Sequence, residues 1–258
     1  MVTRPGAILL PAAFPGRWAG LWMMPQTDTS PRPKEPGRET TFYVFAYGSL
    51  LFEPECPAHL RETFPAVLPG FRRAFNKISL RRATARAESF NAFALPGDSF
   101  QREGKNLSLA LGTESAAGET IVGGLQVYPT GHRPEVQRAL DQREGFSADR
   151  PLSQNGYLRS EVIVRREQQS LRAITYLTNP DDGCAWTIGP QVDVLLRAKV
   201  LINATPIEAS SGLARGLDYL QETRKELASI GERDPALEEL VRAVHRFDGP
   251  WLARVGSL

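Results

Sequence analysis

The chain has 258 residues, which is enough for one large domain or two small ones with a substantial apolar core. Its 31 Lys and Arg residues against 29 Asp and Glu leave a formal charge of +2, so the composition gives no argument for nucleic-acid binding. No apolar run of about 18 residues occurs, and no membrane span is predicted. The two cysteines, Cys56 and Cys184, lie far apart, which disfavours a disulfide framework and favours a cytoplasmic protein.

The N-terminal 40 residues are expected to lie outside the folded domain. The apolar run from Ala7 to Leu10 is interrupted by Pro11 and is too short for a secretory signal of about 7–15 apolar residues. Residues 27–41 are rich in Pro, Thr and charge, a composition typical of disordered linkers. We therefore predict a disordered extension over 1–40 and a single domain over 41–258.

Six segments are predicted to form strands. The first is rich in aromatic and β-branched residues and ends at Gly48, which indicates a buried strand. The last two are joined by Glu167-Gln168-Gln169-Ser170, a plausible hairpin connection. Residues 96–106 and 113–119 are predicted to form loops. The predicted strands are 42–47, 74–80, 107–111, 121–128, 157–165 and 171–178.

Four helices are predicted, three of them in the last third of the chain. Pro134 suits the first turn of a helix, apolar residues follow at helical spacing, and Gly145 suits its end. Asp234 followed by Pro235 is an N-cap and first-turn signal. Because most strands precede most helices, the sequence predicts an α+β fold with a mixed or barrel-like sheet. The other predicted helices span 192–201 and 213–230, and the last spans 235–247.

The motifs of several common enzyme classes are absent. The sequence contains no GxSxG, P-loop or GxGxxG pattern. Its three histidines, His59, His132 and His245, have no metal-ligand partner three to five residues away, so no metal site is predicted. The arginine pairs are interpreted as solvated strand edges; they are Arg72-Arg73, Arg81-Arg82 and Arg165-Arg166.

Two features could carry chemistry. Tyr47-Gly48-Ser49-Leu50 follows a buried strand, and successive N–H groups in such a turn can bind a carboxylate. Glu144 is the last residue before the glycine that ends a helix, where the helix dipole and neighbouring aromatic residues raise its pKa toward the range of a general base. Each feature alone is more often structural: an ordinary strand–turn junction, or a surface glutamate at a frayed helix end.

Several further short sequence segments follow in chain order, and with these two features they span residues 42–247. They are Gly70-Phe71-Arg72-Arg73-Ala74-Phe75, Leu140-Asp141-Gln142-Arg143-Glu144, Gly156-Tyr157 with Val162-Ile163-Val164, residues 173–180 with Ile188-Gly189-Pro190, and Ser211-Gly212 with Asp218-Tyr219-Leu220. Together with the Tyr-Gly-Ser-Leu loop, they resemble the ChaC-like γ-glutamylcyclotransferase family.

The resemblance implies a small closed or nearly closed β-barrel surrounded by helices. It also implies an enzyme that needs no cofactor or metal and cyclises the γ-glutamyl group of glutathione to 5-oxoproline, releasing Cys-Gly. The α-amine of the substrate attacks its own γ-carbonyl, so holding the folded-back pose contributes much of the rate. By resemblance, residues 47–50 would hold the α-carboxylate, Glu144 would transfer the proton, and Tyr157 would line the pocket. Tyr176 is a weaker candidate.

The chain also departs from the family pattern. Phe52 stands where the family commonly has an aromatic residue such as Trp, the segment Arg81-Arg82-Ala83 stands near a frequent His-Arg-Gly, and a single Gly156 replaces a double glycine. These differences concern the walls of the substrate site. The same chemistry on another γ-glutamyl amine or dipeptide therefore stays open, as does a non-catalytic binding or regulatory protein on this fold. The oligomeric state is left open.

Overall fold

The computed structural model of the protein describes residues 40–209 and 212–256. The predicted disordered extension thus lies outside the described residues, apart from Thr40. The strands are β1 (Thr41–Ala46), β2 (Glu62–Ala85), β3 (Gln101–Arg102), β4 (Lys105–Pro129), β5 (Tyr157–Arg166) and β6 (Gln169–Thr178). The α-helices are α1 (Arg133–Glu144), α2 (Val194–Asn203), α3 (Gly216–Ser229) and α4 (Pro235–Val244).

Five of the strands close into a barrel. The sheet order is β1-β6-β5-β2-β4-β3, and β1 also pairs with β4, so only the short β3 stands outside the closed ring. The β1–β6 pairing is parallel and the others are antiparallel. Closure pairs strand edges that would otherwise be exposed. The prediction of an α+β fold built on a mixed barrel is confirmed.

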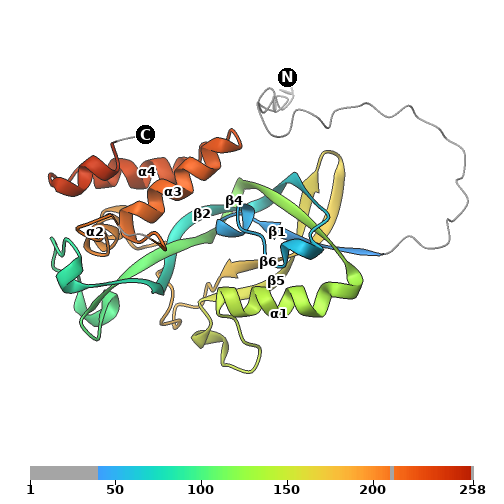
Figure 1. The fold of residues 1–258 in the computed structure, drawn as a ribbon, viewed down its shortest axis with the longest axis horizontal. Helices are drawn as coiled ribbons and strands as arrows, with labels where there is room; N and C mark the ends of the chain where they lie inside the picture. The colour runs from blue at the N-terminus through green and yellow to red at the C-terminus, as the bar shows by residue number, and fades with distance from the viewer. Residues whose placement is uncertain (1–39, 210–211, 257–258) are drawn as a thin grey trace, which may run out of the picture.

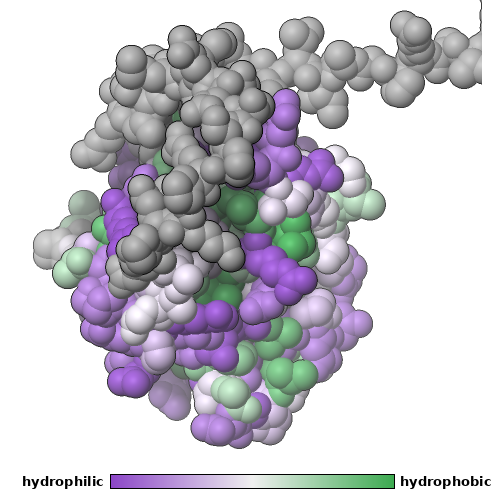
Figure 2. Space-filling view, turned by 90° about the vertical axis from the view of Figure 1, so that its right-hand side faces the viewer, coloured by the Kyte–Doolittle hydropathy of each residue, from purple (hydrophilic) through white to green (hydrophobic). Residues whose placement is uncertain are grey.

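The helices lie in two places around this barrel. Figure 1 shows α1 alongside β5 and β6, whereas α2, α3 and α4 gather at the other end of the molecule. The predicted helical C-terminal third is therefore confirmed. None of the helices in residues 40–209 and 212–256 is both long and apolar enough to cross a membrane. On the face drawn in Figure 2, hydrophobic residues outside the grey atoms form separate patches among hydrophilic ones.

The loop predicted over residues 113–119 is wrong. These residues belong to β4, which is 25 residues long and pairs along most of the 24-residue β2. Residues 115–120 are mostly exposed; Ser115 and Thr120 pair with Phe71 and Pro69 of β2, whereas residues 116–119 between them have no partner in this register. The predicted loop over 96–106 likewise contains β3 and the first residues of β4. Register shifts along β2, for example between Pro69 and Phe71, allow so long a strand to bend.

The packing of α1 determines where Glu144 lies. Val136 and Leu140 are fully buried in a cluster that includes Val44 of β1 and Ile174 of β6. Burial of such side chains contributes about 1.5–3 kcal/mol each. Because residues four apart share one face of a helix, Glu144 continues the face on which Leu140 is buried. The apolar contacts of α1 thus place the carboxylate against the barrel.

Candidate active site

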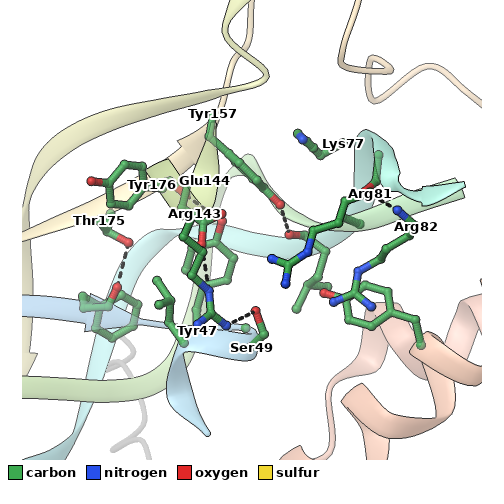
Figure 3. Close-up of a pocket in the computed structure, with 17 residues that line it drawn as sticks. Tyr47, Ser49, Lys77, Arg81, Arg82, Arg143, Glu144, Tyr157, Thr175 and Tyr176 are labelled. Carbon is green, nitrogen blue, oxygen red and sulfur yellow. Dashed lines mark hydrogen bonds and ion pairs between the residues drawn. The ribbon is translucent and has the colours of Figure 1, made fainter. Parts of the chain in front are cut away.

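One cavity brings together all six residues that the sequence predicts for the site. It encloses about 110 Å³, less than the roughly 300–1,000 Å³ of sites that enclose a drug-sized ligand. Its walls come from the end of β1, from β2, β4, β5 and β6, and from α1 and α3 (Figure 3). The predicted residues that line it are Tyr47, Gly48, Ser49, Leu50, Glu144 and Tyr157.

The loop that follows β1 turns at once into a short 3₁₀ helix, Ser49–Leu51. The Leu51 N–H donates to the carbonyl oxygen of Gly48 at 2.9 Å, which closes the turn. The N–H groups of Ser49 and Leu50 stand at the start of this turn and have no acceptor inside it. Binding of an anion by these N–H groups stays a prediction.

Three side chains from distant parts of the chain hold this loop. Arg73 Nε donates to the Tyr47 carbonyl at 2.9 Å, and Gln126 Nε2 donates to the Leu50 carbonyl at 2.7 Å. Arg143 Nη2 donates to Ser49 Oγ at 3.2 Å. The loop is thus attached to β2, β4 and α1 at three successive points.

Arg73 corrects the interpretation of Arg72-Arg73 as a solvated edge. Its side chain is 1% exposed. It donates to Asp234 Oδ2 at 2.9 Å and also to the carbonyl of Val122. Asp234 in turn accepts from backbone N–H groups at the start of α4. Arg73 therefore links the loop at Tyr47 to the last helix of the fold.

Glu144 is the last residue of α1, and Gly145 ends the helix in the left-handed conformation with φ of 68°. The predicted helix end is confirmed. The Glu144 side chain is 16% exposed, and its Oε1 lies 3.8 Å from Arg143 Nε. Burial raises the pKa of Glu144, while the positive charges of Arg143 and Lys77 oppose the rise. The predicted direction is confirmed, but burial is the largest cause rather than the helix end.

Three buried tyrosines surround Glu144. The Tyr47 hydroxyl donates to the Tyr176 carbonyl at 2.6 Å, and the Tyr157 hydroxyl donates to the Leu111 carbonyl at 2.5 Å. The Tyr176 hydroxyl donates to Asp141 Oδ1 at 2.6 Å. Burial raises the pKa of all three phenols, so they stay neutral near pH 7. Tyr176, the weaker candidate, also lines the cavity.

A group of cations from β2 was missed by the sequence argument. Lys77, Arg81 and Arg82 line the cavity, across from Glu144 and Arg143 (Figure 3). The Arg82 guanidinium lies 3.5 Å from the centroid of the Tyr219 ring, and burial lowers the pKa of Lys77. Within residues 40–209 and 212–256, none of these three cations forms an ion pair with an acidic side chain.

Lys77, Arg81 and Arg82 form a cationic wall of the cavity. The alternation of side chains along a strand is the sequence pattern that could have indicated it. Lys77 and Ser79 alternate along β2 and both line the cavity, and Arg81 and Arg82 follow where the register with β4 shifts between Ser79 and Thr84. Residues at such spacing point to the same face. The interpretation of Arg81-Arg82 as an ordinary solvated edge is therefore wrong: Arg81 is exposed, but it is exposed at the mouth of this cavity.

Comparison with known proteins agrees with this architecture. No curated protein sequence matches the chain. Two crystal structures of the γ-glutamyl cyclotransferase specific to glutathione from yeast match it with 21% and 18% identity and TM-scores of 0.50 and 0.53. Each match covers 80% of this chain, and 96% and 99% of the yeast chains. The family model described as ChaC-like protein matches residues 42–247, so the chain belongs to the ChaC-like protein family.

Proposed function

We propose that the protein is a γ-glutamylcyclotransferase that converts the γ-glutamyl group of glutathione into 5-oxoproline and releases Cys-Gly. The observation that carries the proposal is that Glu144 and the loop at residues 47–50 line the same cavity. Family membership and the similarity to the yeast glutathione-specific enzyme support it. A cytoplasmic location, suggested by the two unpaired cysteines, belongs to the same proposal.

The loop supplies the anchor for the substrate. The N–H groups that open the turn at Ser49 and Leu50 bind the α-carboxylate of the γ-glutamyl group. The α-ammonium, one carbon away from that carboxylate, then lies toward Glu144 on the neighbouring wall. Ser49 takes no part as a nucleophile, because its hydroxyl oxygen accepts a hydrogen bond from Arg143 and no histidine lines the cavity.

Glu144 moves the proton. Its carboxylate removes a proton from the α-ammonium, and the amine attacks the γ-carbonyl carbon, which forms the five-membered ring with two hydrogens still on its nitrogen. The bond from that carbon to the cysteinyl nitrogen then breaks as the proton held by Glu144 passes to the departing amine, and the second proton of the ring nitrogen follows through the same carboxylate, so the products are the neutral lactam and the ammonium form of Cys-Gly. The raised pKa of Glu144 suits both steps, since the group must accept and return a proton near neutral pH. Water is neither consumed nor released.

The cationic wall supports glutathione among the possible γ-glutamyl substrates. Glutathione carries a second carboxylate on its glycine, and the loop at 47–50 can hold only the first. Arg81, exposed at the mouth and without an ion-pair partner in the described part of the chain, is placed to meet the second. Lys77 and Arg82 add positive charge to the same wall. An amine product without a carboxylate would leave these charges unused.

The test is the release of 5-oxoproline from three compounds: glutathione, γ-Glu-Ala and γ-Glu-methylamide. We expect the highest kcat/KM for glutathione and the lowest for the methylamide, which lacks the second carboxylate. Arg81→Gln should raise KM about tenfold for glutathione, a loss of about 1.4 kcal/mol, and leave the methylamide unaffected. If the methylamide reacts as well as glutathione, the assignment of the wall is wrong. Binding of glutathione without any 5-oxoproline would instead support a non-catalytic protein.

A further inference from the structure

A second cluster of chemically active side chains lies at the opposite end of α1. His59 Nε2 is 3.2 Å from Glu135 Oε2, and His132 Nδ1 is 3.7 Å from the same oxygen. One donor atom from each of the three residues lies within 4.8 Å of the other two. The cluster is separate from the cavity, because Glu135 and Glu144 are nine residues, or about 13 Å, apart along the helix.

The fold brings these residues together from two places in the chain. His132 is the N-cap residue of α1 and Glu135 lies in its first turn, so the two share one face of the helix. His59 ends a short 3₁₀ helix, Pro57–His59, in the segment that leads from the substrate loop to β2. The two imidazole rings stack with their centroids 3.8 Å apart.

We propose that His59, His132 and Glu135 bind a divalent transition-metal ion of the Zn²⁺ type. Two imidazole nitrogens and one carboxylate oxygen are a donor set that binds zinc. Tetrahedral bonds of about 2.1 Å hold donor atoms about 3.4 Å apart, close to the observed 3.2 and 3.7 Å. Ca²⁺ and Mg²⁺ prefer sites made entirely of oxygen donors. The expectation of no metal site overlooked Glu135, three residues after His132.

The surroundings indicate moderate affinity. The side chains of His59, His132 and Glu135 are 25%, 42% and 59% exposed, so an ion can enter from solvent and keep a water ligand. The positive end of the α1 dipole and the neighbouring Arg133 act against a cation. The stacked rings must also tilt, because each nitrogen lone pair lies in the plane of its ring. Binding therefore breaks the stack.

A bound ion would fix the segment that carries the substrate loop. Residues 49–59 already contact α1 at its other end, where Arg143 donates to the Glu53 carbonyl at 2.9 Å and to Glu55 Oε1 at 2.8 Å. The metal would add a second attachment at His59. The segment between the two attachments would then be held against the helix at both ends.

The test is titration of Zn²⁺ into the untagged full chain by calorimetry, in a Cys56→Ser background that removes the thiol three residues before His59. We expect saturable binding of one ion with a Kd below about 0.1 mM. Glu135→Gln, His132→Gln and His59→Gln should each weaken it at least about tenfold. His245→Gln is the matched control, because the third histidine is exposed at the end of α4 and should leave binding unchanged.

Thermal unfolding with and without the ion guards against misfolded variants. At a Zn²⁺ concentration about 100 times the Kd of the parent, the parent should unfold about 5–10 °C higher, whereas each ligand variant should gain at most about half of that shift. Absence of saturable binding, or binding that survives both Glu135→Gln and His132→Gln, would overturn the proposal.

Discussion

The sharpest prediction is that Glu144→Gln removes activity without removing stability. Glutamine keeps the shape of the side chain but cannot accept the proton from the α-ammonium. Positioned acid–base groups contribute about 10²–10⁴-fold to rate, so kcat for 5-oxoproline release should fall by that factor. Binding of glutathione should change little, because the substrate carboxylates are held by the loop and the cationic wall.

The stability of this variant follows from the burial of Glu144. Burial raises the pKa of the carboxyl group in the folded state, so the folded state binds the proton more tightly than the unfolded state. The folded protein therefore loses stability as the pH rises from the ordinary pKa of a glutamate to the raised pKa of Glu144. The loss is about 1.36 kcal/mol for each pKa unit between the two values. Glutamine avoids this loss. It gives up only the 3.8 Å contact with Arg143, which at such a distance is worth at most about 1 kcal/mol.

Glu144→Gln should therefore be at least as stable as the parent at pH 8, and the two should converge near pH 4, where the glutamate is also neutral. Thermal unfolding from pH 4 to 8, beside a 5-oxoproline assay, measures both effects. Glu222→Gln, an exposed change on α3, is the control for loss of one negative charge. A variant that keeps more than a tenth of the activity would refute the proton-transfer role. A variant that is less stable at pH 8 but not at pH 4 would refute the account of the buried charge.

Two further predictions follow from the same site. The kcat/KM for glutathione should rise with pH through a pKa above the ordinary glutamate value of about 4.3, because Glu144 must be deprotonated to act as a base. A pH profile of kcat/KM that rises at the ordinary glutamate pKa instead would contradict the burial of Glu144. Arg73→Met should cost about 3–5 kcal/mol by leaving Asp234 without its buried partner. At about 2–4 °C per kcal/mol, the unfolding temperature should fall by at least about 6 °C, whereas a fall of less than 2 °C would show that the pair contributes little.

Local signals predicted the elements that carry the two reactive features. The aromatic run before Gly48 gives β1, and Pro134 and Gly145 mark both ends of α1 within a residue or two. Such signals act through the backbone of a few neighbouring residues, so they can be detected in one sequence. The joining of the two features in one cavity came instead from the family resemblance, because no local pattern states which distant elements meet.

The residues that were missed owe their roles to long-range contacts. Arg73 is buried because its partners at Tyr47 and Asp234 lie 26 and 161 residues away. A pair of arginines in a strand gives no sign of such partners, and its charge predicts exposure. The start of the polar stretch 113–119 was missed for a related reason, since the strand conformation of residues 113–115 comes from pairing with β2 and not from their own composition.

The three attachments of the substrate loop explain why a site with so little chemistry needs a closed barrel. A cyclisation that uses the substrate's own amine depends on holding the α-carboxylate of the substrate at a fixed distance and orientation from the carboxylate of Glu144. Arg73 from β2 and Gln126 from β4 hold the loop carbonyls on the barrel side, while Arg143, the neighbour of Glu144, holds Ser49 on the helix side. Arg143, which holds the loop, and Glu144, the base, are neighbours at the end of α1. A shift of this helix therefore displaces both together. The distance between substrate anchor and base is thus set by one helix packed on one barrel.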